Sequence, residues 1–145
     1  MKANEVLANV TKMIESGEQY KARCGFSKKW RIYDVCEELG IFDWWNDYMS
    51  VSQLKQMKKF LETAIELGYT GYVCFKVGAE GCSHGMWAYK KDSEDGYSLK
   101  DGGCLHHSFR GGDNYYDLQF EDGNWLGNDE KWQFTLKEIK AALNK

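Results

Sequence analysis

Proline is absent from this chain, and so are several features that direct a sequence to a particular class of protein. No turn or helix kink can depend on the fixed backbone angle of proline. No apolar run approaches the ~18 residues that a membrane-spanning helix needs. The N-terminal residues 1–17 carry charges throughout and lack the apolar stretch of a signal peptide. We therefore predict a cytoplasmic protein with no membrane partner.

Cysteine is present, but not in a number that suits a disulfide framework. The five cysteines are an odd count, and their spacing along the chain is irregular. A closed set of disulfide bonds pairs an even number of cysteines, so the sequence favours free thiols and a reducing compartment.

Basic charge is scarce in the second half of the chain. Residues 1–68 contain 10 basic and 10 acidic side chains, whereas residues 69–145 contain 9 and 12, which accounts for the whole net charge of −3. Nonspecific affinity for nucleic acid depends on a basic surface, so this balance disfavours nucleic acid as a partner. One short basic strip remains at residues 28–31, K-K-W-R.

The first part of the chain predicts helices. In residues 4–17 the apolar side chains fall three and four positions apart, as on one face of a helix. Asn4 is expected to cap the start of this helix, and Gly17 to end it in a left-handed turn. A second helix is expected to start after Ser27 and to end at Gly40.

The best-defined helix begins at Ser50. Ser50 and Gln53 have the S-x-x-Q spacing of a capping box, in which each side chain satisfies a backbone N–H at the helix start. Gly68 is expected to follow the end of this helix. Thr135 and Glu138 repeat the capping-box spacing and predict a C-terminal helix.

From residue 69 the pattern becomes alternating, which is typical of strands. Residues 69–77, YTGYVCFKV, are apolar on both faces, which favours a central strand. Residues 85–91, 104–109 and 114–120 are expected to form further strands, because glycine-containing turns separate them.

The order of these elements predicts an α+β fold: N-terminal helices, then an antiparallel sheet of four or five strands, then a C-terminal helix. No repeat or linker divides the chain, so we expect one domain over residues 1–145. Within it, residues 1–68 are expected to form a helical part, 69–134 a β-meander and 135–145 the C-terminal helix.

All three histidines lie with two cysteines in residues 81–107. Alternation along a strand puts Cys104 and His106 on one face, and Cys82 and His84 share a face if their segment is also extended. Thiolate and imidazole suit zinc, so these four residues are an alternative metal site. Structural zinc sites commonly have about two to four residues between paired cysteines, which differs from this spacing. We therefore expect no cofactor, with zinc as the alternative.

The same residues offer a second alternative, a Cys/His-dependent enzyme. Cys104 would be the nucleophile, and His84 or His106 would hold its thiol ionised. The usual device that lowers a cysteine pKa is a helix N-terminus, whereas Cys104 follows two glycines at the start of a predicted strand. Catalysis is therefore not the function that we expect.

Aromatic residues are abundant. Six Trp, nine Tyr and seven Phe make up 15% of the chain, and the interior of a 145-residue protein does not easily hide so many large rings. Rings left at the surface favour contact with a partner. The residues that we expect to form such a surface lie on or beside the strands: Trp87, Tyr89, Tyr115, Tyr116, Asp117 and Trp125.

The leading hypothesis is a non-catalytic intracellular binding protein that recognises a protein partner through this aromatic and acidic surface. Acidic side chains within residues 113–130 would steer a basic partner. Small acidic domains of this kind are common among inhibitors encoded by phages and other mobile elements, and by this association the chain is expected to be such an inhibitor. A further alternative is a nucleotide or single-strand nucleic-acid binder that uses Trp30, Arg31 and Arg110. A homo-oligomer formed through an apolar sheet edge fits the same sequence.

Overall fold

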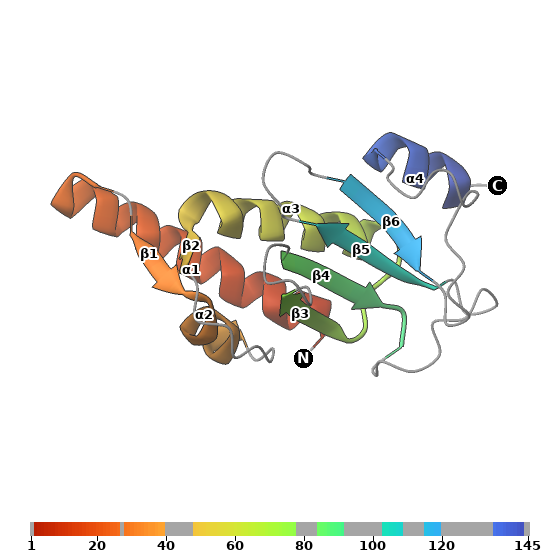
Figure 1. Ribbon diagram of the computed structural model, residues 1–145, viewed down its shortest axis with the longest axis horizontal. Coiled ribbons are helices and arrows are strands. Elements are labelled where there is room, and N and C mark those ends of the chain that lie inside the picture. The colour runs from red at the N-terminus through yellow and green to blue at the C-terminus, as the bar shows by residue number, and fades with distance from the viewer. Residues whose placement is uncertain are drawn as a thin grey trace.

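Helices and antiparallel strands both occur in the computed structural model, which confirms the α+β class (Figure 1). The structure describes residues 2–26, 28–39, 48–77, 84–91, 103–108, 115–119 and 135–143. Its elements are, in chain order, α1 (Ala3–Cys24), β1 (Lys29–Arg31), α2 (Ile32–Leu39), β2 (Tyr48–Ser50), α3 (Val51–Glu66), β3 (Val73–Val77), β4 (His84–Tyr89), β5 (Cys104–Ser108), β6 (Tyr115–Gln119) and α4 (Leu136–Leu143).

The larger sheet has the strand order β3-β4-β5-β6, and each strand is antiparallel to its neighbour. Strands that follow one another in the chain therefore lie side by side. The register aligns Cys74 with Trp87, Trp87 with His106, and His106 with Asp117 across the four strands. Alternate positions consequently form continuous rows on each face of the sheet.

The helices α1 and α3 lie side by side, and their apolar side chains share one core with one face of this sheet, which we call the inner face (Figure 1). The opposite face is the outer face. Burying one large apolar side chain in such a core stabilises the fold by roughly 1.5–3 kcal/mol. Fully buried members of the core include Val6, Val10, Leu39, Leu54, Leu61, Phe75, Met86, Leu105 and Ile139.

The shorter sheet consists of β1 and β2, which pair antiparallel with Lys29 opposite Ser50. It lies with α2 beside the C-terminal half of α1, at the end of the molecule opposite α4 (Figure 1). Strands of three residues are too short to show an alternating pattern, which is why this region was predicted to be helical.

The prediction that the first helix ends at Gly17 is wrong. α1 continues to Cys24, and Gly25 then adopts the left-handed conformation with φ of 78°. Gly17 lies inside the helix, where an added Cβ would come within 2.7 Å of Trp30 and Val51. The glycine is required for close packing at this position, and not for a turn.

Two other helix boundaries also differ from those predicted. α1 begins at Ala3, so Asn4 lies inside it, and the N-cap position is Lys2, whose side chain makes no capping hydrogen bond. α2 begins at Ile32 and not directly after Ser27, because residues 29–31 pair with β2 instead.

The strand β3, expected to be central, is at the edge of the four-stranded sheet in the part of the chain that is described. Both of its faces are nevertheless buried. Val73 and Phe75 belong to the core, and Cys74 packs on the outer face with Tyr89 and Cys104. Because both faces of β3 are buried, its sequence is apolar throughout, although the described part of the sheet has a paired strand on only one side of it.

Both predicted capping boxes are present. At α3 the Gln53 N–H donates to Ser50 Oγ at 3.3 Å, and the Ser50 N–H donates to Gln53 Oε1 at 3.0 Å. At α4 the reciprocal contacts of Thr135 and Glu138 measure 3.1 and 3.3 Å. Gly68, with φ of 94°, follows α3 as predicted.

α1 is a helix of 22 residues whose buried positions form one stripe that ends at Gly17. The last seven residues, 18–24, contain no buried side chain. Charged residues recur along α1, and among the helices described here none is both long and apolar enough to cross a membrane.

Candidate functional site

The outer face of the sheet gathers thiols, aromatic rings and an imidazole. Cys74, Tyr89 and Cys104 form a small buried cluster there, with exposed fractions of 3%, 7% and 0%. Trp87 packs against this cluster and is half-buried, while His106 is buried beside it. The register and the alternation of the strands place all five on this face.

His106 stacks on Trp87, with ring centroids 4.3 Å apart and ring planes at 29°. Gly85 makes room for this stack. A Cβ at that position would lie 2.6 Å from His106 Nε2 and 3.1 Å from the Trp87 ring. The imidazole therefore lies over the backbone of β4, in a position set by close packing.

The zinc alternative falls only partly within the described residues. Cys104 and His106 share the outer face, as predicted. The side chain of His84 and the whole of Cys82 lie outside the described residues. Within the described ranges, no group of three or more His, Cys, Asp or Glu side chains is placed to hold a metal ion. A zinc site that uses Cys82 stays a prediction.

The catalytic alternative depends on the thiol of Cys104. This side chain has no exposed surface, and it packs against Cys74 and Tyr89. A nucleophilic thiolate must be accessible to its substrate, so the burial of Cys104 favours a packing role for this residue.

Tyr116, one of the residues predicted to contact a partner, points into the core. Its ring stacks on His107 with centroids 4.3 Å apart and lies 6.4 Å from the ring of Phe60. Its exposed fraction is 8%, and burial raises the pKa of its phenol. His107 and Phe60 are themselves stacked at 5.8 Å, so the three rings join α3 to β5 and β6.

The described part of the structure therefore does not place the six residues predicted to contact a partner on one surface. Trp87 and Tyr89 lie side by side on the outer face, and Trp87 is the more accessible of the two. Tyr116 lies on the inner face. The side chains of Tyr115 and Asp117, and the whole of Trp125, lie outside the described residues, and their role stays a prediction.

Another group of aromatic side chains lies at the end of α1. Phe26 is 60% exposed and meets Tyr20 edge to face, with centroids 5.5 Å apart. The ammonium of Lys28 lies 5.5 Å from the centre of the Tyr20 ring and 5.4 Å from that of the Trp30 ring. Lys28 thus makes cation–π contacts with two rings. We call Tyr20, Phe26, Lys28 and Trp30 the aromatic rim.

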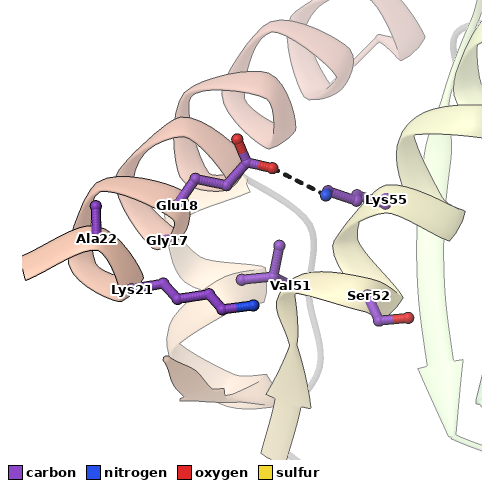
Figure 2. A pocket seen from close by; sticks show the side chains of 7 residues that line it. All are labelled: Gly17, Glu18, Lys21, Ala22, Val51, Ser52 and Lys55. Carbon is purple, nitrogen blue, oxygen red and sulfur yellow. Dashed lines mark ion pairs between the residues drawn. The ribbon is translucent and has the colours of Figure 1, made fainter. Parts of the chain in front are cut away.

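A cleft of about 730 Å³ lies between the C-terminal half of α1 and the first turns of α3. We call it the α1–α3 cleft. Figure 2 shows Glu18 and Lys55 facing each other across it, and Lys21 extending from α1 toward the start of α3. The residues that line the cleft are Gly17, Glu18, Lys21, Ala22, Val51, Ser52 and Lys55.

Gly17 connects the aromatic rim to the cleft. The Trp30 ring approaches it from β1 and the Val51 side chain approaches it from α3, so closely that only glycine fits between them. Val51 also lines the cleft, together with the small side chain of Ala22. The lining therefore combines a small apolar area with charged side chains.

The ion pair of Glu18 and Lys55 crosses the cleft with an N–O distance of 2.9 Å, and each side chain is 57% exposed. The hydrogen bond and the charge of Lys55 lower the pKa of Glu18, and Lys21 and Lys58 add smaller effects in the same direction. A surface ion pair of this exposure contributes little to stability. The ion pair matters because three lysines, Lys55, Lys21 and Lys58, are close enough to lower the pKa of this carboxylate.

Positive charge prevails around the cleft and the rim. Residues 18–31 contain five basic side chains and one acidic side chain, a net charge of +4 in a chain whose total is −3. The strip at residues 28–31 is visible in the sequence. Its continuation through Lys21 and Arg23 depends on α1 reaching Cys24, and the predicted end at Gly17 concealed it.

Comparisons of the chain with protein-family models, with curated proteins and with solved structures find no match.

Proposed function

We propose that this chain is a non-catalytic binding protein that recognises a partner protein through the aromatic rim and the adjoining α1–α3 cleft. The observation that carries the proposal is the exposed ring of Phe26, set beside Tyr20, Lys28 and Trp30 and joined to a cleft through Gly17. Aromatic side chains flanked by cations are enriched where proteins bind one another, because one ring removes a large area from water on contact.

The burial of Cys104 supports a binding protein over the enzyme alternative. A reactive thiol needs access to substrate, whereas this one has no exposed surface. The ring of Trp87 on the outer face is only half-buried, so the surface predicted from the sequence remains a second candidate contact. Steering of a basic partner by the acidic side chains of residues 113–130 stays a prediction, as does a role as an inhibitor from a phage or mobile element.

Affinity capture from a lysate of the native host, with quantitative mass spectrometry, tests the proposal. Immobilised wild-type protein is compared with Phe26→Ser, with Trp87→Ser, and with Lys137→Ser on the exposed side of α4 as a control. We expect at least one protein to be enriched by wild type and by Lys137→Ser, and to be lost with Phe26→Ser.

Two results would contradict the proposal. If no protein is enriched over an unrelated bait, the chain does not act by binding a protein. If a protein is captured equally by wild type and Phe26→Ser but lost with Trp87→Ser, recognition belongs to the outer face and not to the rim.

A further inference from the structure

The α1–α3 cleft has an asymmetric lining, and the asymmetry indicates the chemistry of an occupant. Small apolar groups come from Gly17, Ala22 and Val51, and two ammonium groups come from Lys21 and Lys55. Glu18 is the one carboxylate in the lining, and Lys55 already pairs with it. An occupant that adds carboxylates beside an apolar side chain would complement both parts of the lining.

The openness of the cleft favours a peptide segment over a small molecule, and its size excludes a folded domain. A volume of about 730 Å³ falls in the range of ligand sites and suits a small molecule or a short peptide segment. The cleft opens to solvent along exposed positions of α1, residues 18–24, so a bound chain could continue past it. A small ligand would stay largely solvated in so open a site, which weakens its binding.

We propose that the α1–α3 cleft binds an acidic segment of a partner protein, with an apolar side chain against Val51 and Ala22 and carboxylates on Lys21 and Lys55. This inference rests on the proposed function and names the partner's chemistry. It departs from the sequence-based expectation of a basic partner. Charge complementarity decides the choice, because residues 18–31, which supply the aromatic rim and part of the cleft lining, carry a net charge of +4.

Single-stranded nucleic acid is also anionic, but the geometry of the rim disfavours it. Stacked bases need free aromatic faces, and the ammonium of Lys28 lies over one face of Tyr20 and one face of Trp30, so within the rim the most accessible ring is that of Phe26. Glu18 and the net charge of −3 repel any anion, but they oppose a strand with one charge per nucleotide more strongly than a short segment with a few carboxylates. Arg110, the third residue of that alternative, lies outside the described residues.

Selection from a library of random peptides displayed on phage, with immobilised wild-type protein as the target, provides the probe. We expect enriched peptides to be net negative and to carry a leucine or an aromatic residue. The strongest peptide is then synthesised with a fluorescent label, and its affinity is measured by anisotropy. Enrichment without an acidic bias would overturn the inference.

Charge-reversal variants locate the binding. We expect the double variant Lys21→Glu/Lys55→Glu to lower the affinity for the labelled peptide by about tenfold or more, because two attractions become repulsions. The matched control is Lys12→Glu with Lys137→Glu, which makes the same change in net charge at exposed positions outside the cleft lining. We expect the control to change affinity by less than about twofold. Equal losses in both would contradict the inference.

Glu18→Gln supplies a test in the opposite direction. Removing this carboxylate frees Lys55 and removes a repulsion, so we expect the acidic peptide to bind about two- to fourfold more tightly. Weaker binding of the acidic peptide to Glu18→Gln would contradict the inference. If the reversed pair does not fold, as judged by circular dichroism, Lys21→Gln with Lys55→Gln is used, and a loss of at least about threefold is then required.

Two further measurements test other occupants of the cleft and distinguish a failure of this inference from a failure of the proposed function. Binding of labelled oligothymidylate that depends on Lys21 and Lys55, or self-association by sedimentation that depends on them, would overturn the acidic peptide in favour of nucleic acid or a second copy. A captured host protein that binds wild type and Lys21→Glu/Lys55→Glu equally, but not Phe26→Ser, would overturn this inference and leave recognition through the aromatic rim standing. No captured protein and no enriched peptide would overturn both.

Discussion

The backbone of Gly71 joins α1 to the sheet, and there is no room for a side chain at this position. It donates its N–H to Tyr89 O at 2.8 Å and accepts from the Ala3 N–H at 3.0 Å. A Cβ at this position would overlap the backbone carbonyl of Lys91, which has no freedom to move aside. Glycine is therefore required at position 71 because the Lys91 backbone lies so close. A left-handed backbone conformation is not the reason, since the φ of Gly71 is not positive.

We predict that Gly71→Ala lowers the free energy of unfolding by about 3 kcal/mol or more, because overpacking against backbone forces the strands apart. Gly25→Ala is the matched control. Gly25 has open space around it and a φ of 78°, so alanine there costs about 1 kcal/mol of left-handed strain. Urea denaturation of both variants measures the difference, and equal losses would contradict the packing argument.

The contrast between Gly17 and Gly68 shows how much of a glycine's role could be predicted. The sequence correctly assigned Gly68 to a turn, because the apolar stripe of α3 ends just before it. It assigned Gly17 to a turn for the same reason, since the buried stripe of α1 also ends there. The reason for Gly17 is the approach of Trp30 and Val51, which are distant in the chain, and no local pattern contains that information.

Gly85 allows the Trp87–His106 stack on the outer face. We predict that Gly85→Ala displaces the imidazole from the indole, since an added Cβ would lie 2.6 Å from His106 Nε2. The expected loss of stability is about 1–3 kcal/mol. In nuclear magnetic resonance spectra, the His106 ring protons should lose the upfield shift caused by the indole. Unchanged His106 shifts in a folded Gly85→Ala variant would show that the stack does not need this glycine.

At the level of elements, the capping box of α3 is a feature that the sequence predicted in full. Ser50 and Gln53 cap each other's backbone at 3.0 and 3.3 Å. This interaction is predictable because both partners lie within one turn, whereas β3 was misplaced because its cover comes from residues far away in the chain. The spacing of two residues in the sequence predicts a local hydrogen bond, but it does not predict where a strand lies in its sheet.

We predict that Ser50→Ala destabilises the protein by about 1 kcal/mol, because a backbone N–H at the start of α3 loses its acceptor. Gln53→Ala should cost less, and the double variant should show a coupling of about 0.5 kcal/mol in urea denaturation. Strictly additive losses would mean that the two side chains do not act as a pair.

The contact between α1 and α3 includes the Glu18–Lys55 pair, which has a defined pH dependence. Lys55 lowers the pKa of Glu18 below its ordinary value of 4.5. The charged carboxylate is therefore favoured in the folded state, so its contribution to stability is present above pH 4.5 and is lost as pH falls through the lowered pKa.

We predict that Lys55→Met raises the pKa of Glu18 toward 4.5 in a titration followed by nuclear magnetic resonance. The small stability gap between wild type and Lys55→Met should close as the pH falls. Lys59→Met, one turn further along α3, is the matched control and should leave the Glu18 titration nearly unchanged. An equal shift in both variants would indicate a general charge effect and no specific pair.

For the molecule as a whole, buried phenols set a limit at alkaline pH. Burial, with a smaller effect of Cys104, raises the pKa of Tyr69 to about 12. The unfolded chain ionises this phenol near 10.0, so the folded state loses stability as pH rises from about 10 to about 12. Burial shifts Tyr116 in the same direction.

We predict that Tyr69→Phe loses less stability than wild type between about pH 9 and pH 11, because it removes one group that ionises only on unfolding. Urea midpoints at the two pH values measure this change. The Tyr116→Phe variant should behave similarly. Parallel losses in wild type and Tyr69→Phe would show that other groups govern alkaline unfolding.

The α+β class of the molecule could be predicted from its sequence, but its candidate site could not. The change of period near residue 69 separates helices from strands, and the structure places that change between α3 and β3. The proposed site combines the end of α1, β1 and the start of α3. Its parts meet through Gly17, and that meeting is a consequence of tertiary packing that neither residue type nor spacing reveals.

The final turns of α1 have a thermodynamic consequence. Residues 18–24 contribute no buried side chain, so they can unwind with little cost to the rest of the fold. Their amide protons should then exchange with solvent far faster than those of the preceding turns. Any molecule that bridges these turns to α3 would slow this exchange, and fraying would diminish in proportion to occupancy.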